Sequence, residues 1–156
     1  MAINSGKAFE REFMDSMPSW AWCYRLRDSA GTWQGGDNTR FTPSNICDFM
    51  VMANRTLNLF ELKTHKGKSL PLSCIKIKNL EQMIAAEENQ GIAAWFLINF
   101  REIEETYALK ATAITNYMHL FPEKKSIPLD YVSSTGKRVP HAKKKVYYVY
   151  DLTGVI

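Results

Sequence analysis

Hydrophobic positions recur with helical spacing at the start of the chain. The apolar face of this predicted helix consists of Ala8, Phe9, Phe13, Met14 and Met17. Asn4 or Ser5 can cap the helix, and Pro18 ends it. Residues 20–27 then predict a first strand, and the polar segment 29–45, rich in glycine and asparagine, predicts a loop. A loop of this length suggests a functional role.

Two apolar runs rich in β-forming residues follow, over residues 46–53 and 57–64, with a short polar turn between them. Such a pair predicts a β-hairpin. After a predicted loop over 65–73, helical spacing returns in residues 80–89 and stops at Gly91. The next run, residues 92–100, is almost wholly apolar, which predicts a strand covered on both faces.

Three weaker patterns complete the chain. Residues 107–111 predict another strand, residues 112–121 a short helix, and residues 146–152 an edge strand. This order of elements predicts an α/β fold in which a mixed central β-sheet is flanked by helices. A length of 156 residues without internal repeats or linkers suits a single domain over 1–156.

The predicted hairpin brings two acidic residues together. If residues 54 and 55 form the turn, Asp48 lies directly opposite Glu61, where Cβ atoms on one face are about 5 Å apart. Lys63, two residues beyond Glu61, projects from the same face. The other members of that face are apolar: Ile46, Met50, Met52, Leu57 and Leu59. The opposite face is predicted to carry Cys47, Phe49, Val51, Asn58, Phe60 and Leu62.

This cluster of two acids and a lysine has a chemical use and a structural alternative. Burial and mutual repulsion both penalise neighbouring carboxylates, and a divalent cation such as Mg²⁺ removes both penalties. Lys63 beside the metal can hold or deprotonate an attacking water, while the metal stabilises charge on a phosphoryl oxygen. The alternative is an ion pair of Lys63 with Glu61 or Asp48 that serves stability alone. A second E-x-K sequence, residues 123–125, lacks both an apolar strand and an opposed acid.

Basic residues are unevenly distributed along the chain. The net charge is +4, yet residues 1–120 carry equal numbers of basic and acidic side chains, so the excess lies in residues 121–156. A second basic cluster has no acid between residues 62 and 80; it contains His65 and Lys63, Lys66, Lys68, Lys76 and Lys78. Two basic patches suggest a polyanionic partner, most simply nucleic acid, although lysine-rich loops are also ordinary solvated surface.

Other classes of protein are disfavoured by the sequence. The apolar runs are far shorter than the roughly 20 residues that cross a membrane, and the charged first thirteen residues contain no signal-peptide core. Three cysteines without a CxxC pair disfavour a disulfide framework and indicate a reducing, cytoplasmic environment. The three histidines lack zinc-binding spacing, and no glycine-rich phosphate loop indicates a nucleotide cofactor.

The acid–lysine pattern resembles a known nuclease superfamily. Asp48, followed by Glu61-Leu62-Lys63 at the end of an apolar strand, is similar to the D…E-x-K core of the PD-(D/E)XK nucleases. Residues 4–10 resemble the opening of RecU-type Holliday-junction resolvases, of the phage-like or short bacterial kind. Segment 66–72 and the helix after it resemble the loop and helix that follow the E-x-K strand in RecU-type resolvases. Strand 92–100 lies where that family has its next core strand. The resemblance spans about residues 4–110 and implies a restriction-endonuclease-like fold.

The resemblance also implies roles for the residues of the pattern. Asp48 and Glu61 would bind the metal, Mg²⁺ or Mn²⁺ in its place, with the Leu62 carbonyl as a third ligand. Lys63 would be the catalytic lysine. The implied activity is a metal-dependent endonuclease that hydrolyses DNA phosphodiesters, most simply at a four-way junction during recombination. Symmetric cutting of a junction implies a homodimer.

Further site residues follow from the same resemblance. Glu10 would be an accessory acid of the site, although an acid near a helix start is also favoured by the helix dipole alone. Gln82 would orient the site, and Ser44 and Asn45 would lie near the scissile phosphate. Segment 29–45 is shorter than the stalk with which RecU proteins are thought to enter the junction centre.

Basic residues of both patches are predicted to contact DNA phosphates. They are Lys66, Lys68, Lys137, Arg138, Lys143, Lys144 and Lys145. The alternative for the C-terminal lysines is an edge strand whose charges prevent sheet-to-sheet association. The same residues also suit two alternative functions: a nuclease with the same core that acts on other DNA structures, and a nucleic-acid-binding module without catalysis.

Overall fold

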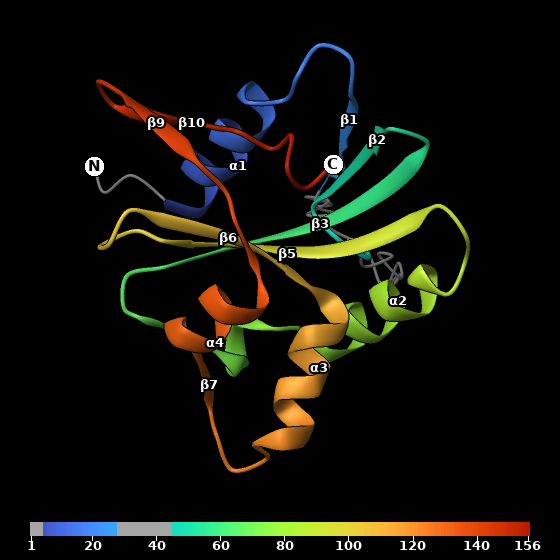
Figure 1. Ribbon diagram of the computed structural model, residues 1–156, viewed down its shortest axis with the longest axis vertical. Helices are drawn as coiled ribbons and strands as arrows, with labels where there is room; N and C mark the ends of the chain where they lie inside the picture. Colours follow the sequence, from blue (N-terminus) through green and yellow to red (C-terminus); the bar gives the residue numbers. More distant parts are fainter. Residues whose placement is uncertain (1–4, 28–44) are drawn as a thin grey trace, which may run out of the picture.

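The computed structural model describes residues 5–27 and 45–156 of the chain. A six-stranded mixed sheet forms its centre, in the order β1-β2-β3-β5-β6-β8 (Figure 1). The strands of this sheet are β1 (Trp22–Arg25), β2 (Phe49–Ala53), β3 (Thr56–His65), β5 (Ile92–Phe100), β6 (Glu105–Lys110) and β8 (Lys137–Arg138). The mixed α/β architecture agrees with the predicted fold class.

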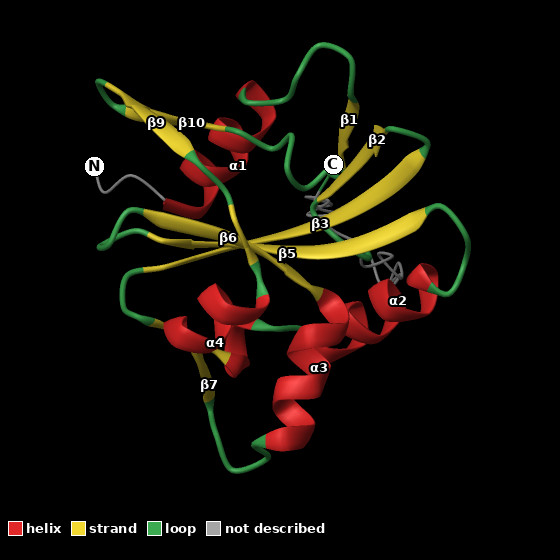
Figure 2. Cartoon of the chain, in the orientation of Figure 1, coloured by secondary structure: helices red, strands yellow, loops and turns green. Residues whose placement is uncertain are grey.

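Helices cover both faces of this sheet (Figure 2). Helix α1 (Ser5–Asp15) lies on one face, and the other face is covered by α2 (Ile77–Glu87), α3 (Ala111–Leu120) and α4 (Leu129–Thr135). Two small sheets complete the described fold. They pair β4 (Ser69–Pro71) with β7 (Ser126–Pro128), and β9 (His141–Lys144) with β10 (Tyr147–Tyr150).

The predicted hairpin is formed by β2 and β3. Phe49 pairs with Phe60 and Ala53 with Thr56, which is the predicted register. Asn54 and Arg55 fill the turn with φ angles of 49° and 63°, as the tight hairpin turns with two left-handed residues require. Strand β3 then runs parallel to β5, and α2 makes the crossover between them.

A hydrophobic cluster lies on each face of the sheet. On one face, Phe13 of α1 packs its ring 4.9 Å from that of Phe49 and 5.1 Å from that of Phe60, measured between centroids. On the other face, buried side chains of α2 and α3 meet the sheet. This second cluster includes Leu59, Leu80, Met83, Phe96, Ile98, Leu109, Ile114 and Tyr117. At about 1.5–3 kcal/mol for each large apolar side chain, these two clusters hold the sheet between its helices.

The structure corrects several predicted boundaries. The first predicted strand is shorter, residues 22–25, and the helix predicted from residue 80 begins at Ile77. Segment 65–73 is not one loop, because it contains the end of β3, β4 and the start of a short 3-10 helix, η1 (Leu72–Cys74). Most of the predicted loop over 29–45, including Ser44, lies outside the described residues. Within the described chain, no helix is long and apolar enough to span a membrane.

Candidate active site

The β2–β3 hairpin positions the predicted acid–lysine cluster, which consists of Asp48, Glu61 and Lys63. Asp48 lies directly before β2, and the other two residues belong to β3. The Asp48 carboxylate accepts a hydrogen bond from the Leu62 amide at 2.7 Å, so it reaches across to β3. The Lys63 Nζ lies 2.6 Å from Glu61 Oε1. The structure therefore brings the predicted site residues together.

The backbone departs from regular strand geometry at Asp48. Its carbonyl accepts a hydrogen bond from the Leu26 amide on one side, whereas its own amide donates to the Phe60 carbonyl on the other. In a regular strand, the amide and carbonyl of one residue point to the same side. A local break of this kind resembles a β-bulge, a feature that re-aims side chains beside active sites.

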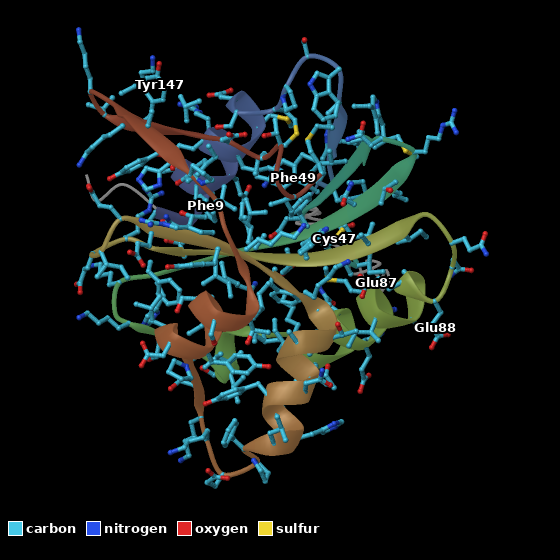
Figure 3. The ribbon with its side chains drawn as sticks, viewed as in Figure 1. Phe9, Cys47, Phe49, Glu87, Glu88 and Tyr147 are labelled. Atoms are coloured by element: carbon cyan, nitrogen blue, oxygen red, sulfur yellow. The ribbon has the colours of Figure 1, made fainter. Side chains whose placement is uncertain are left out.

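This break makes two predictions wrong. Cys47 was predicted to share a face with Phe49, but it packs with Leu59 in the cluster under α2 and α3. Phe49 lies on the α1 side, where Phe9 also points (Figure 3). The strict alternation assumed from residue 46 holds only from Phe49 onward, because β2 begins there. The regular pairing of β2 with β3 ends at Phe49 and Phe60, so Asp48 is not the direct partner of Glu61 that the sequence predicted. Asp48 contacts β3 through its amide, which donates to Phe60, and through its side chain.

Burial and neighbouring negative charge disfavour ionisation of the acidic groups in and beside this cluster. Glu61 is 5% exposed. Burial, and then the Glu61 charge, raise the pKa of Asp48 to about 6, although the Leu62 amide and the Lys63 ammonium oppose this shift. Burial, followed by the Glu61 and Asp48 charges, raises the pKa of the Cys47 thiol to about 12. Two carboxylates that repel each other in a buried place form a site suited to a cation.

The donor set at this site fits a hard divalent ion. Both side-chain donors are carboxylate oxygens, the ligands that Mg²⁺ and Mn²⁺ take. Among residues 5–27 and 45–156, no third histidine, cysteine or acid joins them in a metal-binding group. Further ligands would therefore be backbone carbonyls, such as that of Leu62, or water.

The raised pKa of Asp48 predicts that its ionisation lowers the free energy of unfolding of the metal-free protein, by an amount that depends on pH. Because the pKa rises from its ordinary value of 3.8 to about 6 on folding, ionised Asp48 destabilises the fold above about pH 6 and has no such effect below about pH 4. Asp48→Asn keeps the acceptor for the Leu62 amide. We expect it to raise the free energy of unfolding by about 1–3 kcal/mol at pH 7.5 in EDTA. Urea unfolding across this pH range should show the gain vanish at acid pH; a loss of stability at pH 7.5 would contradict it.

Glu10 lies close to the cluster but is held by another residue. Its Oε2 accepts hydrogen bonds from Nε and Nη2 of Arg25 on β1, at 2.8 and 2.5 Å. Its charge also contributes, as the smallest cause, to the raised pKa of Asp48. No sequence pattern pairs Glu10 with Arg25, because the two residues belong to a helix and a strand that packing alone brings together. The role of Glu10 as an accessory acid stays a prediction.

Gln82 and Asn45 lie beside the segment that leads into Asp48. Exposed Gln82 on α2 lines a shallow groove together with Asn45, Ile46 and Met50. The Asn45 side chain donates to the Arg27 carbonyl at 2.6 Å, so it braces β1 against this segment. No hydrogen bond among the described residues links Gln82 to the acids of the cluster. Its orienting role and the phosphate contacts of Asn45 also stay predictions.

The predicted DNA-binding residues lie in loops and on short strands of the described chain. Lys66 and Lys68 are exposed after β3. In β8, Lys137 donates to the Gly154 carbonyl at 3.1 Å and Arg138 lies 3.6 Å from the Glu105 carboxylate. The last three, Lys143, Lys144 and Lys145, are exposed at the end of the β9–β10 hairpin. The predicted edge strand over 146–152 is β10, paired with a strand that the sequence pattern missed.

Comparison with known proteins decides the family. The family model for RecU, described as recombination protein U, matches residues 32–152. The chain belongs to the RecU family. The match continues beyond residue 110, where the resemblance in the sequence was thought to end, so the C-terminal segment belongs to the RecU homology. It begins after the first-helix segment 4–10 that carried part of that resemblance.

Curated RecU relatives and a solved resolvase structure are similar to this RecU chain. A Holliday junction resolvase RecU of Oceanobacillus iheyensis is 36% identical over 94 residues, which cover 58% of this chain and 47% of that protein. The protein of the same name from Streptococcus uberis is 30% identical over 81 residues, covering 51% and 40%. The chain thus spans about half the length of the curated relatives it matches.

The structural likeness supports the fold. The Holliday junction resolvase Hjc of Archaeoglobus fulgidus superposes with a TM-score of 0.55 at 16% identity, covering 85% of this chain and 95% of that one. At this level of identity, the likeness concerns the fold. The RecU chain therefore has the restriction-endonuclease-like fold that the sequence resemblance implied.

Proposed function

We propose that this RecU-family chain is a metal-dependent endodeoxyribonuclease that resolves four-way DNA junctions during recombination, in the cytoplasm of a bacterium or a phage-infected host. The observation that carries the proposal is the cluster of Asp48, Glu61 and Lys63 at the break before β2, in which Glu61 is buried and the other two residues are partly buried. Purely structural ion pairs seldom bury two acids against one lysine, because the second acid stays uncompensated. Membership of the RecU family supports the same activity.

In this proposal, Asp48 and Glu61 hold Mg²⁺, or Mn²⁺ in its place, together with the Leu62 carbonyl. When bound, such an ion supplies a Lewis acid for the phosphodiester and an acidified water as nucleophile. The protein contributes position: the Leu62 amide fixes the Asp48 carboxylate, and the Glu61 carboxylate fixes the Lys63 ammonium. Lys63 can then hold the attacking water and exchange a proton with it, or stabilise charge on the phosphate.

Other side chains around the cluster would serve binding and orientation. Glu10, which Arg25 holds beside Asp48, would be an accessory acid reached through water. Exposed Gln82 and the neighbouring Asn45 would orient the DNA strand that enters beside Asp48. Lys66 and Lys68, exposed beyond the end of β3, would bind phosphates on the other side of the scissile bond. Lys137 and Arg138 would add phosphate contacts from β8.

A homodimer follows from the proposed substrate, because symmetric cutting of a four-way junction needs two sites related by a two-fold axis. Strand β1 offers a surface for such an interface. It is an edge of the central sheet, and Trp22 and Tyr24 on it are about half exposed, with rings stacked 5.9 Å apart. Exposed Met52 on β2 is paired with Trp22 and extends the same apolar patch. A patch of this kind on an edge strand is typical of a surface that a second copy covers.

The decisive experiment uses the unmodified chain with labelled four-way junctions and linear duplex of the same sequences, in Mg²⁺ and in EDTA. We expect paired nicks in the junction with Mg²⁺, no cleavage in EDTA, and a light-scattering mass of two chains. Equal cutting of linear duplex would favour a nuclease with another target. Binding without any cleavage in Mg²⁺ or Mn²⁺ would reduce the chain to a nucleic-acid-binding module.

A further inference from the structure

The β9–β10 hairpin projects from the molecule and is anchored along one strand. The Tyr148 amide donates to Glu12 Oε1 at 3.3 Å and the Tyr150 amide to Ser16 Oγ at 2.9 Å, so β10 is fixed to α1. Beyond the last paired residues the hairpin closes through a two-residue turn. Figure 1 shows the hairpin extending past α1, and Figure 3 shows Tyr147 near its tip. The tip is therefore held in place while its end stays accessible.

The tip carries an apolar residue that the fold does not need. Val146 in the turn is 91% exposed, and the neighbouring Lys145 adopts a left-handed φ of 35°. β-Branched residues are not among those that favour turns, and a side chain exposed to water contributes no hydrophobic stabilisation. Sites where a sequence breaks such local rules are often functional. Val146 therefore adds little to the packing of the described chain and is accessible to a partner.

Charges surround this apolar tip. Lys143 is paired with Glu104, which also accepts a hydrogen bond from the Tyr148 hydroxyl at 2.6 Å, so this lysine braces the hairpin. Lys144 and Lys145 are exposed and form no ion pair with any residue that the structure describes. Two available cations thus lie directly beside the exposed Val146.

The tip is connected by concave surface to the end of the catalytic strand. One hollow lies between Val146 and α1 and is lined by Lys7 and Arg11. A second hollow reaches from Val146 to Arg101, which follows β5, and to Lys66, which follows β3 and lies three residues beyond Lys63. The acids Glu12 and Asp15 also line these hollows, together with the four basic residues. A ligand that leaves the acid–lysine cluster along this surface can therefore reach a basic side chain in each hollow on its way to the hairpin tip.

We propose that the β9–β10 hairpin grips a duplex arm of the DNA substrate by its minor groove. This inference rests on the proposed function for the identity of the ligand. Lys144 and Lys145 contact the phosphates that border the groove, and Val146 enters between them. Because α1 covers β10, only the narrow turn can enter a groove; the major groove, about 12 Å wide, suits a whole ribbon, while the minor groove is about 6 Å wide. Apolar wedges flanked by basic residues are characteristic of minor-groove binding.

The test measures binding of the full chain to an A·T-rich duplex in EDTA, where metal-dependent cleavage is absent. We expect Val146→Ser to weaken binding roughly 3–10-fold with an unchanged salt dependence, because a wedge is lost and no charge is removed. Removing Lys144 and Lys145 together should lower the slope of log K against log salt by about 2. Netropsin, a minor-groove ligand, should abolish the difference between Val146→Ser and the unmodified chain.

A matched control and a second variant keep the inference open to refutation. Leu120→Ser makes the same kind of change at a residue that is 68% exposed on α3, and should leave binding unchanged. Val146→Thr also makes the side chain more polar but keeps its branched shape. Its binding can be compared with that of the unmodified chain if Val146→Ser does not fold. Unchanged binding by both Val146 variants, an equal loss with Leu120→Ser, or insensitivity to netropsin overturns the proposal. A chain that shows the Val146 effect but never cleaves junctions refutes the nuclease alone; one that cleaves without the effect refutes the hairpin grip alone.

Discussion

Replacement of Lys63 by alanine is expected to lower junction cleavage by about 10³-fold or more while DNA binding in EDTA changes little. The ammonium lies 2.6 Å from Glu61 Oε1, inside the acid–lysine cluster, so its loss removes both a proton carrier and a positive charge at the site of reaction. The measurement is single-turnover cleavage of a four-way junction at saturating protein and Mg²⁺. Single-turnover conditions separate the chemical step from binding and product release.

Two control variants decide whether Lys63 acts in chemistry or only in folding. Lys125→Ala alters the lysine of the second E-x-K sequence, which is exposed between α3 and β7, and should keep full activity. Lys63→Arg keeps the charge beside Glu61, but a guanidinium does not give up its proton in proteins. It should therefore restore stability without restoring the rate. A cleavage rate of Lys63→Ala within tenfold of that of the unmodified chain would show that Lys63 forms only a structural ion pair.

The hairpin could be predicted because its register depends on local features alone. Alternating apolar residues and a two-residue turn fix which positions of two adjacent strands face each other. The pairing of Phe49 with Phe60 follows from the turn at Asn54 and Arg55. This register predicts that Asp48 lies near Glu61, although the regular pairing ends one residue before it would include Asp48. The parallel neighbour β5 was equally visible, because burial on both faces makes its sequence almost wholly apolar.

Other features of the site depend on contacts that one segment does not encode. The break at Asp48 arises from hydrogen bonds to Leu26, which follows β1, and to Phe60 of β3, and no periodicity in residues 46–48 predicts it. Cys47 was placed on the wrong face for that reason. The bond between Glu10 and Arg25 likewise needs α1 to lie on the sheet beside β1. The break at Asp48 and the contact of Glu10 depend on how separate elements pack together, and the pattern of residues within one element does not encode this packing.

The C-terminal segment was the least predictable part of the fold. Its strands are short, with β8 only two residues long, and β9 consists of histidine, alanine and two lysines. Such residues carry no hydrophobic alternation, so β-propensity alone cannot identify them. What orders the segment is a buried polar anchor on another element, namely Glu12 of α1, which is 5% exposed.

Glu12 joins three parts of the chain around one carboxylate. Its Oε2 lies 3.2 Å from Arg101 Nη2, at the end of β5, and accepts a hydrogen bond from the Tyr150 hydroxyl at 3.4 Å. Its Oε1 accepts from the Tyr148 amide. The Arg101 guanidinium also lies 5.9 Å from the Phe9 ring centroid and 5.7 Å from that of Tyr148, between two aromatic rings. Removing the carboxylate would leave this cation with little compensation in a largely dry place.

Glu12→Ala is therefore expected to lower the free energy of unfolding by about 2–4 kcal/mol, because it leaves a mostly buried Arg101 without its counter-charge. Urea unfolding measures this loss, and limited trypsin digestion should cut at Lys143, Lys144 and Lys145 sooner as the hairpin leaves α1. Glu81→Ala, at an exposed position of α2, is the matched control and should change stability by less than about 0.5 kcal/mol. Combining Glu12→Ala with Arg101→Met should recover part of the loss, since the unpaired charge is then gone. A double variant no more stable than Glu12→Ala would show instead that the backbone contact to Tyr148, and not the charge, anchors the hairpin to α1.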